Sequence, residues 1–123
     1  MISRGIIAPK AKELLKNGEY RSTIIELSAS LEDILFLKMF FEYGRDINSM
    51  KTWTLGKYVA ELERHNSLNK TRMKSLKQFV NLRNVIIHNR NALITIVLNP
   101  KSKKKLIDLL RNVYKIAVQL KAV

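Results

Sequence analysis

The sequence predicts an all-α protein, an up-and-down bundle of about five helices in which the longest helices form the core. Two observations carry this prediction. Apolar residues recur at spacings of three and four over most of the chain, the period of a helix with one buried face. Of the 123 residues 46% are hydrophobic and only four are Gly, so the chain can bury one core, and we expect a single domain over residues 1–123.

The pattern of residues 1–44 predicts two helices. Residues 9–16 form the first, with Pro9 near its first turn and Gly18 as its stop. Residues 19–43 form a long second helix, and Gly44 can adopt the left-handed conformation that ends it. The buried face of this second helix is marked by residues at helical spacing: Ile24, Leu27, Leu31, Ile34, Leu35 and Lys38.

The middle of the chain predicts a polar connection over residues 45–50 and then two more helices. Thr52 or Thr54 can cap the third helix, because a hydroxyl accepts a hydrogen bond from a free backbone N–H of the first turn. Asn69 or Thr71 can cap the fourth helix, which continues for about five turns. Both helices carry an apolar stripe that we expect to face the core.

The last part of the chain is less uniform. Residues 89–91 predict a turn or loop, and residues 92–98 are ambiguous because several of them are β-branched and could be extended. Asn99 and Pro100 form a strong start signal, so residues 101–121 predict the last helix.

The positive charge lies in one part of the sequence. Residues 1–50 hold seven Lys or Arg and seven Asp or Glu, whereas residues 51–123 hold sixteen against three, which accounts for the formal charge of +13. Such a surface favours a polyanion, most simply RNA; a solvated basic surface is the alternative. Residues 64–107 contain no Asp or Glu, and we call them the basic interval. The predicted RNA-binding residues lie in it: Lys70, Lys74, Lys77, Arg90, Lys101, Lys103, Lys104 and Lys105.

A histidine lies within this basic interval, at the end of the fourth predicted helix. Histidine is the side chain that most readily transfers protons near neutral pH, so His88 in a basic surface indicates chemistry on a polyanion. Arg83 falls in the middle of the helix's apolar stripe, where a charge is costly unless it is paired or faces a cleft or another subunit. On a straight helix Arg83 and His88 diverge by roughly 140°. A homodimer with facing helices would place both side chains around a shared cleft.

The segment from Arg83 to His88 resembles the signature of the HEPN family. That signature is Arg, a polar residue that is often Asn, three variable residues, and then His, late in a helix; the full pattern is present here, including Asn84. The resemblance implies a HEPN-like helical bundle and a metal-independent RNA endonuclease, in some members a toxin or a defence component. It differs from some nuclease members in one respect, because residues 77–82 contain no acid before Arg83.

The resemblance implies catalytic roles for three residues. His88 would act as the acid or base, Arg83 would hold the phosphate oxygens at the transition state, and Asn84 would donate to the phosphate or hold the imidazole. Glu32, on the second helix, is our candidate for an acid that orients Arg83. The products would be a 2′,3′-cyclic phosphate and a 5′-hydroxyl.

Two alternatives to the nuclease stay open. The domain could be a non-catalytic HEPN-like module that binds nucleotide or nucleic acid, or that partners a nucleotidyltransferase. If the domain is a toxin nuclease, a nucleotidyltransferase-type partner would be its antitoxin. The domain could also be a basic helical scaffold with no site. In those cases His88 would cap the helix C-terminus and Arg83 would pair with a buried carboxylate.

The composition limits which cofactors the chain could bind and in which compartment it is expected. The chain has no Cys and only two His, His65 and His88, without acidic partners, so we expect no metal and no cofactor. The lack of Cys fits a reducing compartment, and no apolar run is long enough to span a bilayer. We therefore expect a cytoplasmic protein with no membrane partner.

Overall fold

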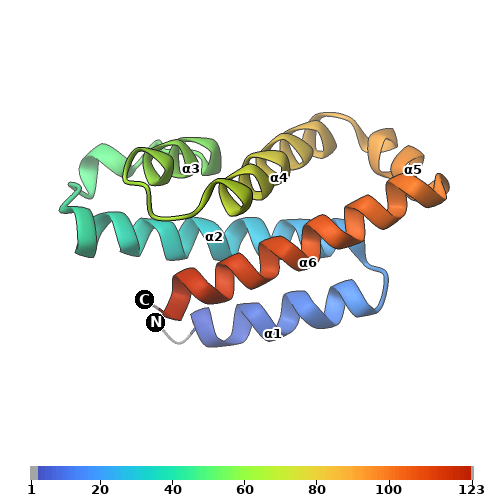
Figure 1. Ribbon diagram of the computed structural model, residues 1–123, viewed down its shortest axis with the longest axis horizontal. Helices are drawn as coiled ribbons and strands as arrows, with labels where there is room; N and C mark the ends of the chain where they lie inside the picture. Colours follow the sequence, from blue (N-terminus) through green and yellow to red (C-terminus); the bar gives the residue numbers. More distant parts are fainter. Residues whose placement is uncertain (1–2, 123) are drawn as a thin grey trace.

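The computed structural model describes the backbone of residues 3–122 and the side chains of residues 10–121. Within that part of the chain there are six α-helices and no strand, which confirms the all-α class (Figure 1). The helices are α1 (Ser3–Lys16), α2 (Tyr20–Tyr43), α3 (Leu55–Arg64), α4 (Lys70–His88), α5 (Arg90–Leu98) and α6 (Pro100–Ala122), with a short 3-10 turn at Asn48–Met50.

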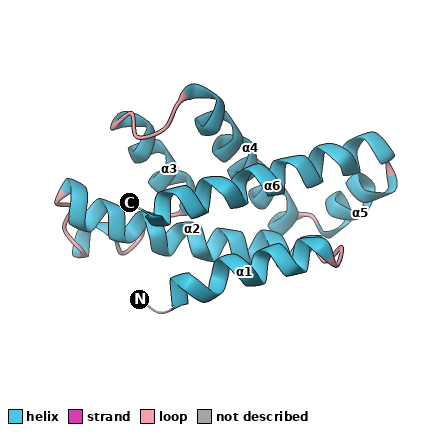
Figure 2. Cartoon of the chain, turned by 60° about the horizontal axis from the view of Figure 1, so that its bottom comes forward, coloured by secondary structure: helices cyan, strands magenta, loops and turns pink. Residues whose placement is uncertain are grey.

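Helix α2 is the central element. It contacts α1, α3, α4 and α6, and in Figure 1 it runs along the length of the molecule with α3 and α4 on one side and α1 on the other. Figure 2 shows α6 lying across α2, between α1 and α4. The core is formed where these helices meet. Its fully buried side chains include Leu27, Leu31 and Leu35 of α2, Leu55 and Leu62 of α3, Leu76 and Phe79 of α4, and Leu110 and Val113 of α6.

The predicted caps fix most helix boundaries. Thr54 Oγ1 accepts a hydrogen bond from Lys57 N at 3.3 Å, and Asn69 Oδ1 accepts one from Arg72 N at 2.8 Å. Gly44 ends α2 in the left-handed conformation, with φ of 62°. Asn99 Oδ1 accepts from Lys101 N at 3.0 Å and opens α6, as its position before a proline indicated.

The count of about five helices was wrong by one helix. Residues 90–98, expected as a loop followed by an ambiguous segment, form α5. Asn89 explains the difference, because it ends α4 and also caps α5 by accepting a hydrogen bond from Asn91 N at 3.1 Å. The β-branched residues then continue the helix because Leu93, Ile96 and Val97 pack against the core beside α6.

The start of the first helix was also misplaced. Helix α1 begins at Ser3, so Pro9 lies inside the helix and not at its first turn. Inside a helix, proline removes one backbone hydrogen bond and its ring crowds the carbonyl four residues earlier, a cost that the packing of α1 along α2 and α6 must offset. The side chains of residues 3–9 lie outside the described part.

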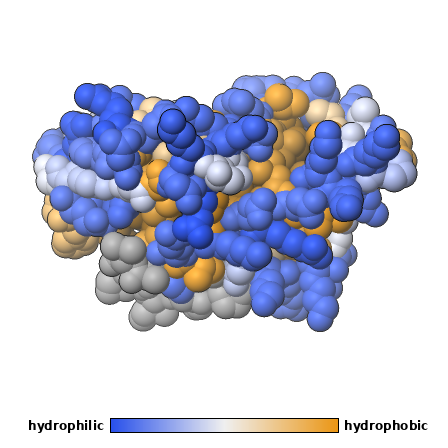
Figure 3. Space-filling view, viewed as in Figure 1, coloured by the Kyte–Doolittle hydropathy of each residue, from blue (hydrophilic) through white to orange (hydrophobic). Residues whose placement is uncertain are grey.

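The face of the molecule that Figure 3 presents is mostly hydrophilic. Figure 3 shows hydrophilic side chains over much of this face, with apolar side chains visible between the helices. No described helix combines the length and the apolar character needed to cross a membrane.

Candidate functional site

Helix α4 presents two different faces. Met73, Leu76, Phe79 and Ile86 are buried and hold the helix against the core. The opposite face carries exposed polar residues whose directions lie within about 40° of His88. We call this face the α4 polar stripe, and it consists of Lys70, Lys74, Lys77, Asn81, Asn84 and His88.

His88 is the last residue of α4, where the chain turns into α5. It is exposed, and Asn84 lies one turn before it on the same face and is also exposed. An imidazole at this place is open to a ligand from solution, and an amide one turn away can share that ligand or support the ring.

Arg83 lies on the inner side of α4 and is half-buried. It lines a cavity of about 350 Å³ between α2 and α4, which we call the α2–α4 groove. The groove is lined by Arg21, Ile24, Ile25, Ser28, Ala29, Glu32, Arg83, Ile86 and Ile87. A guanidinium at the edge of an apolar cavity is less hydrated than one on an open surface, so it would bind an anion there more strongly.

Glu32 is placed in the same groove as Arg83. It is half-buried, and no ion pair joins it to Arg83 among the described residues. Burial raises the pKa of Tyr58 of α3, and the charges of Glu32 and Asp33 raise that pKa further. Glu32 therefore acts electrostatically toward α3 as well as facing the groove that holds Arg83.

The two principal motif residues do not meet within one chain. Arg83 lines the α2–α4 groove and His88 does not, because five residues along a helix turn the second side chain by roughly 140°. The groove is bordered by apolar side chains that face solvent: Ile25 is 55% exposed and Ile87 is 52% exposed. Two large aliphatic residues beside a half-buried arginine form a surface that a second chain could cover.

The predicted RNA contacts fall into two groups. Lys70, Lys74 and Lys77 follow one another along the α4 polar stripe, and all three are exposed. Lys77 is partly neutralised, because its Nζ lies 2.6 Å from a carboxylate oxygen of Glu63 on α3. The other group is formed by the start of α5 and the first turns of α6: Arg90, Lys101, Lys103, Lys104 and Lys105.

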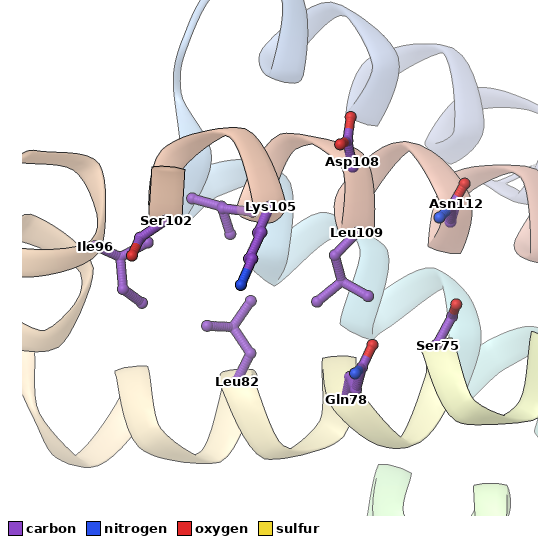
Figure 4. Close-up of a pocket in the computed structure, with 10 residues that line it drawn as sticks. Ser75, Gln78, Leu82, Ile96, Ser102, Lys105, Asp108, Leu109 and Asn112 are labelled. Atoms are coloured by element: carbon purple, nitrogen blue, oxygen red, sulfur yellow. The ribbon is translucent and has the colours of Figure 1, made fainter. Parts of the chain in front are cut away.

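Lys105 enters a second cavity, of about 620 Å³, between α4, α5 and α6. Figure 4 shows its side chain directed from α6 toward Leu82 of α4, and Asp108, also on α6, is among the residues that line the cavity. Ser75, Gln78 and Asn112 supply hydrogen-bonding groups to the same space. This cavity opens on the side of α4 that faces α6, so it is separate from the α2–α4 groove.

One charged cluster was missed from the sequence. The side chain of Glu61 of α3 is only 3% exposed, and its carboxylate pairs with Arg45, with Lys57 at 3.3 Å and with Arg64 at 3.2 Å. Burial alone would raise the pKa of Glu61, but the hydrogen bond from Lys57 and the charges of Arg45 and Arg64 together lower it. Part of the cluster could have been found from the sequence, because Lys57 lies four residues before Glu61 and Arg64 lies three residues after it on the same helix. The contact with Arg45 joins residues distant in sequence and is visible only in the folded chain.

The cluster is structural, and it continues into an aromatic group. Arg45 and Lys57 also lie over the ring of Trp53, at 5.9 Å and 5.3 Å from its centroid. Trp53 contacts Tyr58 edge to face, with 5.2 Å between ring centroids. The half-buried Trp53 thus anchors the connection between α2 and α3.

The described residues contain no group of three or more His, Cys, Asp or Glu that could hold a metal ion. His65, the other histidine, ends α3 and stacks on the ring of Tyr43, with 3.7 Å between centroids and an interplanar angle of 4°. The arrangement on α4 can therefore supply proton transfer from His88 and anion binding from Arg83 without using His65.

Comparison of this chain with models of protein families, with curated proteins and with solved structures gives no match. The resemblance to HEPN domains therefore depends on the pattern from Arg83 to His88 and on the helical layout.

Proposed function

We propose that the protein binds RNA along α4 and cuts it without a metal, as a HEPN-like endonuclease whose site is completed by a second copy of the chain. The observation that carries the proposal is the placement of the two motif residues: Arg83 in a groove with an exposed apolar border, and His88 at the end of a basic, exposed stripe on the same helix.

A second copy supplies what one chain lacks. In a dimer related by a two-fold axis near the end of α4, the exposed Ile25 and Ile87 would be covered, and Arg83 of one copy would approach His88 of the other. Two equivalent sites would form, each with an arginine and a histidine from different chains. Covering the apolar border would also remove water from around Arg83, which strengthens its attraction to a phosphate.

The chemistry then follows from the residue types. His88 accepts the proton of the ribose 2′-hydroxyl as its oxygen bonds to phosphorus, and the bond from phosphorus to the 5′-oxygen breaks. The leaving oxygen takes a proton from solvent. Arg83 binds two non-bridging oxygens, on which negative charge grows, and Asn84 donates to the same phosphate. The products are a 2′,3′-cyclic phosphate and a 5′-hydroxyl.

The basic residues position the substrate. Lys70 and Lys74 extend the polar stripe along α4, and the first turns of α6 provide a second set of cations. Contacts of this kind bind any phosphate backbone and carry no sequence information. The resemblance further supports a role as a toxin or defence nuclease in the cytoplasm, held inactive by a nucleotidyltransferase-type antitoxin.

A non-catalytic RNA-binding module is the second candidate. It is favoured by the separation of Arg83 from His88 within one chain and by the lack of an acid between residues 77 and 82. In that case the α4 polar stripe would bind RNA, and Arg83 would only hold the helix against α2. The two candidates differ in one measurable property, the appearance of cleaved ends.

The test is incubation of RNA with the wild-type protein and with His88→Ala, in EDTA. We expect cleavage by the wild type and a loss on the order of 10²-fold or more in the variant, the scale of a positioned general acid or base. Arg83→Lys should be nearly as harmful, because lysine keeps the charge and loses the two-pronged contact. His65→Ala is the matched control and should cut normally. Cleavage that needs Mg²⁺, or that survives in both motif variants, would reject the mechanism.

A further inference from the structure

A third cavity lies away from α4. It is formed by α1, α2 and α6, has a volume of about 540 Å³, and is lined by Ala11, Lys12, Leu15, Lys16, Tyr20, Thr23, Leu27, Ile107, Leu110, Arg111, Tyr114 and Lys115. We call it the α1–α6 groove. None of its lining residues belongs to α4, so it is independent of the proposed cleavage site.

The floor of the groove is apolar. Ala11, Leu27 and Leu110 are at most 1% exposed, and they come from the three different helices that meet there. Tyr20 and Tyr114 are half-buried and pack against the same core. Aliphatic side chains with two phenol rings form a surface that holds the apolar body of a small molecule.

The border of the groove is cationic. Lys12 and Lys16 lie one turn apart on α1, and Arg111 and Lys115 lie one turn apart on α6. All four are exposed, and none makes an ion pair or a hydrogen bond among the described side chains. Nor does any Asp or Glu appear among the described lining residues. Lys10, on the same helix, is by contrast paired with Glu26 at 3.2 Å.

This combination defines the ligand chemistry. Four unpaired cations around an apolar floor repel one another, so they attract an anionic group placed among them. If the ligand also has an apolar body, that body leaves water when it contacts the floor. A single carboxylate would neutralise one cation, whereas a phosphate monoester carries up to two charges and three acceptor oxygens that Lys and Arg bind. The volume lies within the range of about 300–1,000 Å³ for small-molecule sites.

The size of the groove argues for a small molecule over a macromolecule. Its lining spans residues 107–115 of α6 and residues 11–16 of α1, which correspond to about 12 Å and 8 Å along the helix axes. That length fits one ring system or a short alkyl chain with its phosphate. We propose that the α1–α6 groove binds a phosphate monoester with an apolar body, alkyl or aromatic, its phosphate held by Lys12, Lys16, Arg111 and Lys115.

The experiment uses octyl phosphate and 1-naphthyl phosphate as probes, titrated into the full chain by calorimetry and followed by NMR of the Leu27 and Leu110 methyl groups. At least one probe should bind at least tenfold more tightly than inorganic phosphate, because only the organic probes bury apolar surface. A probe that binds should also bind more tightly than its neutral alcohol, octanol or 1-naphthol, because only the phosphate meets the cations. Binding of octyl phosphate alone assigns an alkyl ligand, and binding of naphthyl phosphate alone assigns an aromatic one.

The matched variants locate the site. Lys12→Gln with Arg111→Gln should weaken binding about tenfold, whereas Lys101→Gln with Lys104→Gln, which removes the same charge elsewhere, should not. Circular dichroism checks that both pairs are folded, and His88→Ala should leave the affinity unchanged. The proposal is overturned if neither probe binds, if the neutral alcohols bind equally well, or if the Lys12 and Arg111 pair binds as the wild type does.

Discussion

At the scale of single residues, Arg83 and His88 illustrate how one helix gives neighbouring residues different environments. Arg83 is half-buried beside α2, and His88 is exposed at the last turn. The environments suit the roles proposed for them, because an anion-binding guanidinium gains from a drier site and a proton-transferring imidazole needs access to its substrate.

The buried carboxylate of Glu61 should contribute to stability in a pH-dependent way. Because its pKa in the folded chain is lowered, its ionised form stabilises the fold at pH values above the carboxyl's ordinary range, and this contribution disappears as the pH falls through the lowered pKa. We expect Glu61→Gln to lower the free energy of unfolding by about 1–3 kcal/mol at pH 7. The difference from the wild type should shrink as the medium becomes strongly acidic.

Denaturant titrations at pH 7 and at pH 3 measure both parts of this prediction. Glu63→Gln is the control, because Glu63 is about half exposed and, among the described side chains, forms an ion pair with Lys77 alone; an exposed ion pair contributes about 0–1 kcal/mol. If the two variants lose equal stability at pH 7, the Glu61 cluster is not a buried network.

At the scale of elements, capping residues predicted more than propensity did. Thr54, Asn69 and Asn99 marked three helix starts that the structure confirms. Helix α5 was missed because its β-branched residues favour extended structure locally, and because Asn89 had to be recognised as the end of one helix and the cap of the next. Packing against α6 decides that segment, and a single sequence does not show packing.

The candidate site was predictable in part for the same reason. Helical periodicity alone placed Asn84 and His88 on one face and Arg83 on another. The α2–α4 groove, the Arg45 contact with Glu61 and the α1–α6 groove each join helices distant in sequence, so they became visible only with the fold.

The α4 polar stripe should determine how strongly the protein binds RNA. Lys70→Glu with Lys74→Glu should weaken RNA binding for all sequences and make its dependence on salt less steep, because fewer counterions are released. Lys103→Glu with Lys104→Glu should act in the same direction from α6. Filter binding at several salt concentrations measures the slopes.

The comparison pair is Lys12→Glu with Lys16→Glu, which makes the same change of charge on α1. Helix α1 lies on the other side of α2 from α4 in Figure 1. Were this pair to weaken RNA binding as much as the α4 pair does, net charge and not the stripe would determine affinity.

At the scale of the whole molecule, the proposed nuclease requires two copies of the chain. The exposed Ile25 and Ile87 border the groove that holds Arg83, so Ile25→Glu with Ile87→Glu should convert a dimer into a folded monomer and abolish cleavage. Light scattering at tens of micromolar, together with circular dichroism, measures both properties. Phe41→Glu is the control, because Phe41 is 75% exposed at the far end of α2 and should leave the dimer intact. A wild-type chain that is monomeric at this concentration would contradict the dimer.

Each proposed cleavage site takes Arg83 from one copy and His88 from the other, and mixing two inactive variants tests this arrangement most directly. Arg83→Ala and His88→Ala chains are unfolded together, refolded as an equimolar mixture and assayed on RNA in EDTA. Random pairing makes about half of the dimers mixed, and each mixed dimer regains one of two sites, so we expect about one quarter of wild-type activity. A mixture no more active than the separate variants, although mixed dimers have formed, would contradict the shared site.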